Sequence, residues 1–209
     1  MAMSEHCTIN PPLSERARGA GAALLAGGSA LGELPLSAQV LIASRLLQRA
    51  ALAMQSALPT ALRDLIDLAI AAMQDCAGTR GQVHRHRTLF EHAMAQRDVE
   101  ATDQSGPIRG MLWYAIDATR AADAAQDFPV DATVMHSTLK SLSALTADAR
   151  VVPLQLHVLM AADIDLLAHA CTEARVDRYA VLPDAVFQRL APVHALTLID
   201  AVREEPSWR

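Results

Sequence analysis

Aromatic side chains are scarce in this 209-residue chain, where three Phe, two Trp and two Tyr make up only 3% of the sequence. The strands of β-sandwiches and barrels favour aromatic and β-branched residues, so this scarcity argues against an all-β fold. A disordered chain is excluded as well, because 52% of the residues are hydrophobic and only 20% are charged. Alanine and leucine are abundant instead, and this composition predicts an all-α, single-domain protein.

The signatures of common enzyme classes are also missing from the sequence. It contains no phosphate-binding loop, no GxGxxG, no GxSxG elbow and no HExxH pair. No glutamate lies three residues before a histidine, which is the spacing that di-iron helical bundles use. We therefore expect no cofactor and no bound metal, and we favour a non-enzymatic protein while leaving an enzyme open.

Cysteines are few and widely separated. Cys7, Cys76 and Cys171 form no CxxC or CxxH pair that would indicate zinc binding or redox chemistry. Cys76 and Cys171 lie in apolar helical segments, where a reduced thiol behaves as a small hydrophobic group. These features predict a cytoplasmic protein in a reducing compartment.

Strong positive charge and long uninterrupted apolar runs are absent too. The net charge is −5, whereas nucleic-acid binding needs a basic face, so nucleic acid is an improbable partner. The longest apolar run, residues 151–171, contains Asp163 and Asp165 at mid-span, which argues against a membrane helix.

Hydrophobic periodicity divides the chain into two parts. Residues 1–33 are rich in Gly, Ala and Pro and predict a flexible arm, and residues 34–209 predict a bundle of six to eight amphipathic helices. Apolar residues recur at helical spacing over 37–57, 60–77, 80–99, 106–126, 131–147, 153–173, 183–190 and 192–203.

Local signals add detail to the first two helices. Ser37 is expected to cap the first, and Gly78 to end the second in a left-handed conformation. The first helix has the amphipathic pattern of a bundle helix, with one polar side that consists of Ser44, Arg45, Gln48, Arg49, Gln55 and Ser56.

The helix at 106–126 carries an unusual tryptophan. Trp113 falls opposite the apolar stripe, on a charged face with Arg109, Asp117 and Arg120. Tryptophan and arginine are enriched at the energetic centres of protein interfaces. Trp113 is therefore either a contact for another protein or covered by a neighbouring helix or the N-terminal arm.

A second candidate site lies on the helix at 153–173. Asp163 falls in the middle of its apolar face, where a buried carboxylate must be paired or protonated. It is either a general base or a structural partner of an inward arginine or a neighbouring helix end. Asp165 and His169 are four residues apart, close enough for a hydrogen bond, and His157 lies on the same broad polar side.

Two further clusters are weaker candidates. His84, His86 and His92 lie near several arginines, but they do not share one helix face with metal-ligand spacing, and a solvated basic face is the favoured interpretation. Asp123 and Asp127 form an i, i+4 pair that lacks the oxygen-rich loop of a cation site, so a solvated acidic face is favoured there.

Together these features predict a protein-binding protein of a bacterial cytosol. The acidic balance suits a neutralising, immunity-type partner of a toxin, which would contact it through Arg109, Trp113, Asp117 and Arg120. The stretch 114–125 resembles segments of helical bacterial immunity proteins, but it is too short and too alanine-rich to assign the family. The alternative is a small-molecule or metal-dependent enzyme whose inter-helix site consists of Asp163, Asp165, His169 and His157.

Overall fold

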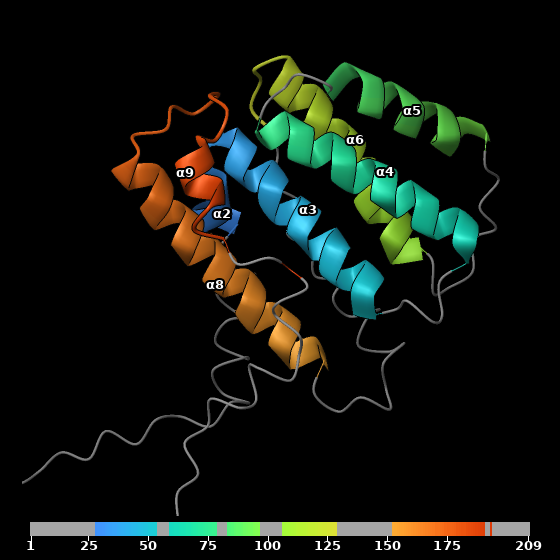
Figure 1. The fold of residues 1–209 in the computed structure, drawn as a ribbon, viewed down its shortest axis with the longest axis horizontal. Coiled ribbons are helices and arrows are strands. Elements are labelled where there is room, and N and C mark those ends of the chain that lie inside the picture. Colours follow the sequence, from blue (N-terminus) through green and yellow to red (C-terminus); the bar gives the residue numbers. More distant parts are fainter. Residues whose placement is uncertain are drawn as a thin grey trace, which may run out of the picture.

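The fold is known from a computed structural model that describes residues 28–53, 59–78, 83–96, 106–128, 152–190 and 193 (Figure 1). These residues form seven helices and no strand, which confirms the predicted all-α bundle. The helices are α2 (Gly28–Glu33), α3 (Leu36–Ala53), α4 (Thr60–Ala77), α5 (Val83–Gln96), α6 (Gly106–Asp123), α8 (Val152–Glu173) and α9 (Asp184–Phe187).

Helix α3 is the centre of the bundle. It packs against α2, α4, α6 and α8, and every residue from Leu36 to Leu47 is buried. The polar side of an amphipathic helix was expected to face water, but Ser44, Arg45 and Arg49 are buried as well. The expectation was wrong for these three residues because α2, α4, α6 and α8 pack around this part of α3, so its polar groups must be satisfied inside the protein. Gln48 is half-buried, and Gln55 and Ser56 lie outside the described residues.

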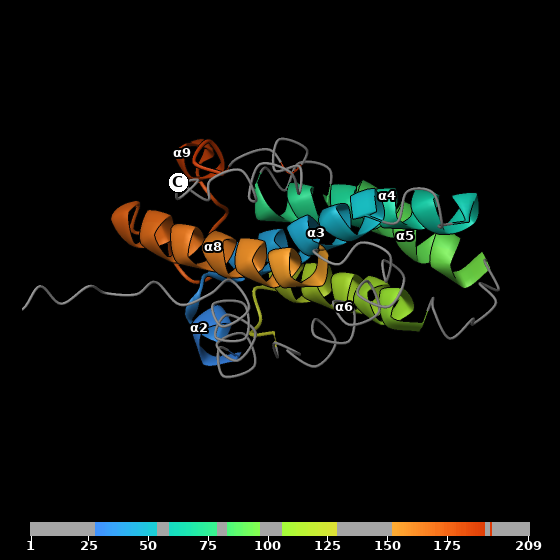
Figure 2. The same ribbon diagram turned by 90° about the horizontal axis from the view of Figure 1, so that it is seen from below.

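Helices α4, α5 and α6 cover one side of α3, and α2, α8 and α9 lie on the other (Figures 1 and 2). Helix α4 spans Thr60–Ala77, as its periodicity predicts. The whole predicted stripe of α4 is buried, and so is that of α6, which comprises Ile108, Met111, Leu112, Ala115, Ala118 and Ala122. On α8, Met160, Ile164 and Leu167 are buried, whereas Leu166 is 37% exposed.

The loop between α8 and α9 ties several elements together. The amide of Leu36 donates to the carbonyl of Arg178 at 2.8 Å, and the amide of Leu182 donates to the carbonyl of Ala77 at 2.8 Å. The hydroxyl of Ser37 donates to the carbonyl of Ala180 at 2.7 Å. The predicted capping role of Ser37 is therefore wrong, since its hydroxyl serves a loop 143 residues away in sequence.

Gly78 also differs from its predicted role. Its φ of −105° is not left-handed, although it does cap the end of α4. A Cβ atom at this position would lie 3.2 Å from the ring of Phe187. The absence of a side chain at Gly78 therefore lets Phe187 of α9 pack closely against the end of α4.

Part of the segment predicted as a flexible arm is helical, because α2 spans Gly28–Glu33. Leu31, in α2, is 2% exposed, so the packed structure includes part of the segment assigned to the arm. The predicted helix at 131–147 lies outside the described residues, and so does the one at 192–203 except for Val193.

Candidate functional site

Trp113 lies on the outer face of α6. Its residue is 52% exposed, which makes it one of the largest apolar groups at the surface of the described residues. Asp117 and Arg120 follow at intervals of four and three, so all three occupy one stripe of the helix. Arg109, one turn earlier, is half-buried. The face predicted from the sequence therefore does place an exposed tryptophan among charged side chains.

The charged side chains beside Trp113 belong to an ion-pair network between α5 and α6. Nε of Arg120 lies 3.0 Å from Oε1 of Glu91, and Nη1 of Arg120 lies 3.7 Å from Oδ1 of Asp117. Nη1 of Arg87 lies 2.8 Å from Oδ2 of Asp123. This network links α5 to α6, although each such surface pair contributes little to stability.

The two α5 histidines with described side chains, His86 and His92, do not share one site. His86 contacts the carboxylate of Asp75 on α4, whereas His92 is exposed. His84 lies on the same helix, with its side chain outside the described residues. His86 therefore links α4 to α5, which is a packing role for one member of the cluster.

Asp163 lies in a buried polar cluster between α8 and α3. Its side chain is 8% exposed, and it accepts hydrogen bonds from Nε of Arg45 at 2.8 Å and Nη1 of Arg49 at 2.5 Å. Of the two predicted roles, the pairing with an inward arginine is the one observed. The sequence signal for this partner is the i, i+4 spacing of Arg45 and Arg49, which periodicity places on the polar side of the helix.

Asp165 and His169 are not brought together with Asp163. Both are exposed, and Nε2 of His169 lies 3.0 Å from Oε1 of Glu173, so the expected hydrogen bond to Asp165 is replaced by one further along the helix. Arg189 also contacts Glu173 and, together with His169, lowers the pKa of its carboxyl group. The side chain of His157 lies outside the described residues.

Asp123 and Asp127 serve different partners. Asp123 pairs with Arg87, whereas Oδ1 of Asp127 accepts hydrogen bonds from Nε of Arg178 at 2.9 Å and from the hydroxyl of Tyr179 at 3.1 Å. The hydrogen bond from Arg178, followed by that from Tyr179, lowers the pKa of Asp127. Both carboxylates therefore link separate elements of the fold, whereas the sequence predicted only that they lie on a solvated acidic face.

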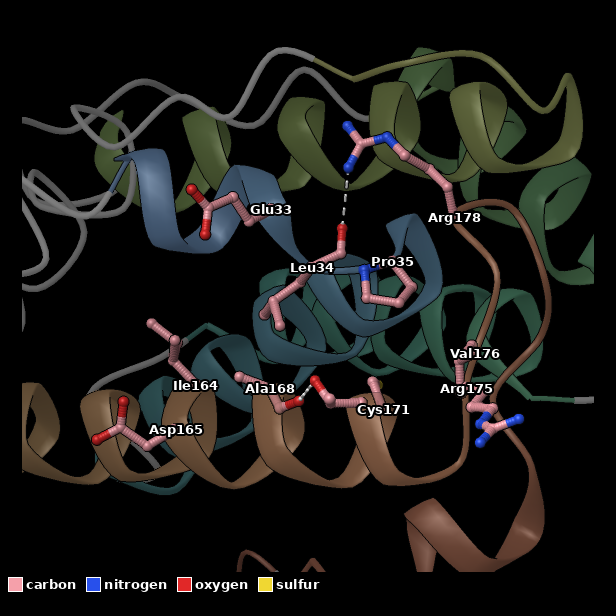
Figure 3. Close-up of a pocket in the computed structure, with 11 residues that line it drawn as sticks. Glu33, Leu34, Pro35, Ile164, Asp165, Ala168, Cys171, Arg175, Val176 and Arg178 are labelled. Atoms are coloured by element: carbon pink, nitrogen blue, oxygen red, sulfur yellow. Dashed lines mark hydrogen bonds between the residues drawn. The ribbon is translucent and has the colours of Figure 1, made fainter.

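A groove of about 450 Å³ lies between the α2–α3 turn and α8 (Figure 3). Its apolar walls include Leu34, Pro35 and Ile164, and Asp165 also lines it. Across the groove, Arg178 reaches over the turn and donates to the carbonyl of Leu34 at 3.3 Å (Figure 3). The arginine is thus engaged with the backbone of the turn, which leaves it poorly placed to bind a ligand.

No three His, Cys, Asp or Glu side chains of the described residues lie close enough together to hold a metal ion. Within the same residues, no helix is both long and apolar enough to cross a membrane. Cys76 and Cys171 are buried free thiols, and burial raises the pKa of Cys171, which keeps it protonated and unreactive.

Comparisons with known proteins give no match: no protein-family model, no curated protein and no solved structure is significantly similar to this chain.

Proposed function

We propose that this protein works by binding another protein through the outer face of α6, with Trp113 at the centre of the contact. The observation that carries this proposal is the 52% exposure of Trp113 in a chain with only two tryptophans. A large exposed ring surrounded by charged side chains is the usual composition of an interface hot spot. Arg109, Asp117 and Arg120 would form the polar rim.

The partner that we propose is a basic protein, in the manner of a toxin neutralised by its immunity protein. The chain carries a net charge of −5, so it would attract a positively charged partner over a long range. The buried free thiols of Cys76 and Cys171 suit the reducing cytosol of a bacterium, where such a pair would meet.

The test is a double substitution, Trp113→Ala with Arg120→Ala, in the full-length protein. We expect the free energy of unfolding to change by less than about 0.5 kcal/mol per site, since both side chains are exposed. Affinity for a partner captured by the unaltered chain should fall roughly tenfold or more, because hot-spot residues dominate binding energy. Urea unfolding gives the first quantity and calorimetric titration of the purified partner the second.

Leu166→Ala is the matched control, because Leu166 is an exposed apolar residue on another helix. It should leave the affinity unchanged. Equal affinity of the double variant and the unaltered chain would reject the α6 face, and unfolding of the double variant would place Trp113 among the structural residues. Co-expression should also relieve the toxicity of the partner if the immunity-type role is correct.

A further inference from the structure

We propose that Arg49 is a binding site for an oxyanion, a carboxylate or phosphate group, at the interface between α3 and α8. The site is the edge of the guanidinium group that carries Nε and Nη2. Both nitrogens are buried, the side chain is 5% exposed, and no described residue offers either nitrogen an acceptor. This site is separate from the α6 face proposed above.

Arg49 is not needed to neutralise Asp163. Arg45 already engages both carboxylate oxygens, with Nε 2.8 Å from Oδ2 and Nη2 3.1 Å from Oδ1. Arg49 adds one further bond, from Nη1 to Oδ2 at 2.5 Å. The guanidinium group of Arg49 therefore contacts a carboxylate that Arg45 already holds through two hydrogen bonds. It makes this contact through Nη1 alone and leaves the edge with Nε and Nη2 unused.

The unused edge of Arg49 has the geometry that oxyanions require. The N–H bonds of Nε and Nη2 are nearly parallel and match the spacing of two oxygens in a carboxylate or phosphate. Arg45 uses this same edge to hold Asp163. Two buried donors without an acceptor cost free energy, and so does the excess positive charge of two guanidinium groups that share one carboxylate; a bound oxyanion would offset both costs.

Arg49 lies close to the C-terminal end of α3. Leu52 follows three residues later on the same side of the helix and is 47% exposed, and α3 ends at Ala53. An anion would enter the α3–α8 interface from this end of α3.

Calorimetric titration of the full-length protein tests the proposal directly. Sodium phosphate and sodium acetate are the two probes, each at an ionic strength matched with sodium chloride. We expect saturable binding of one anion per chain and a rise in melting temperature with anion concentration. Binding of phosphate alone indicates a phosphate-bearing ligand, binding of acetate alone indicates a carboxylate, and binding of both indicates a general oxyanion site. Absence of saturable binding by either probe overturns the proposal.

Arg49→Lys identifies the residue responsible, because lysine keeps the positive charge but cannot form two parallel hydrogen bonds. We expect it to weaken anion binding about tenfold or more. Arg175→Lys, at an exposed arginine on the loop after α8, is the control and should leave the titration unchanged. Equal binding by Arg49→Lys and the unaltered protein would contradict the assignment. If Arg49→Lys does not fold, the Nε–H signals of ¹⁵N-arginine-labelled protein decide: saturable movement of a buried signal supports the site, and its absence rejects it.

Discussion

At the scale of single residues, the buried cluster of Asp163, Arg45 and Arg49 is the most consequential feature. A lone buried carboxylate on an apolar helix face is consistent with either catalysis or structure. The bidentate contact from Arg45 determines the structural role, because both oxygens of Asp163 are occupied. Asp163 thereby fixes the position of α8 on α3, and it is not available as a base.

Asp163→Asn should destabilise the protein by about 3–5 kcal/mol, because it leaves two buried guanidinium groups without their counter-charge. The free energy of unfolding in urea measures the loss. Asp165→Asn is the matched control, since Asp165 lies two residues away on the exposed side of the same helix. It should change stability by less than about 0.5 kcal/mol. Equal effects of the two substitutions would show that the buried cluster does not hold α8.

At the scale of the helices, α6 and α8 end in the same way. At the end of α6, the amide of Gln126 donates to the carbonyl of Ala121 at 2.9 Å, and Ala125 has a φ of 49°. The end of α8 repeats the pattern with Arg175 at a φ of 51°. This is the Schellman motif, in which glycine normally occupies the left-handed position. Neither end carries glycine, so neither could be located from a glycine signal in the sequence.

Replacing Ala125 with glycine should therefore stabilise the protein. A Cβ atom in the left-handed conformation costs about 1 kcal/mol, and glycine removes that cost without losing a buried side chain, since Ala125 is exposed. We expect Ala125→Gly to raise the free energy of unfolding by up to about 1 kcal/mol, as thermal or urea unfolding would measure. Ala124→Gly, at a neighbour without positive φ, should give no gain. A loss of stability in Ala125→Gly would mean that the turn does not hold this conformation.

At the scale of the whole molecule, Arg178 joins segments that are distant in sequence. Its guanidinium donates to the carbonyl of Gly32 at 2.8 Å, near the end of α2, and pairs with Asp127 beyond the end of α6. Its own carbonyl accepts from Leu36 at the start of α3. One loop thus holds the two sides of the bundle in place around α3.

The contacts of Asp127 make part of this linkage dependent on pH. Arg178 and Tyr179 lower the pKa of Asp127 below its ordinary value of 3.8, so the folded state binds its proton less tightly than the unfolded state. The contribution of Asp127 to stability is therefore present above pH 3.8 and is lost as the pH falls through the lowered pKa.

Asp127→Asn should lower stability slightly at pH 7, with no difference from the unaltered protein at a pH below the lowered pKa. Urea unfolding at both pH values measures this difference, and the loss at pH 7 should shrink in high salt because the group is exposed. Asp177→Asn, at a nearby exposed carboxylate, is the control. A loss that persists unchanged at low pH would exclude the ion pair as its cause.

Much of the fold was accessible from the sequence, because local periodicity fixes which residues form helices. The bounds of α4 and the buried stripes of α4 and α6 were predicted correctly, since apolar residues at helical spacing can be buried only on one face. The position of Trp113 opposite the apolar stripe followed from the same periodicity, whereas its 52% exposure did not. Local spacing also indicated that Asp163 must find a partner.

The tertiary structure alone decided which partner each group found. Periodicity gives the faces of a helix but not its neighbours, so it could not reveal that α3 is surrounded and that its polar side is buried. For the same reason it could not pair Asp163 with Arg45 and Arg49, which are more than 110 residues away. The sequence by itself therefore determined an alanine-rich helical bundle with few aromatics, and the packing of its helices decided which charges lie inside the protein and which lie at its surface.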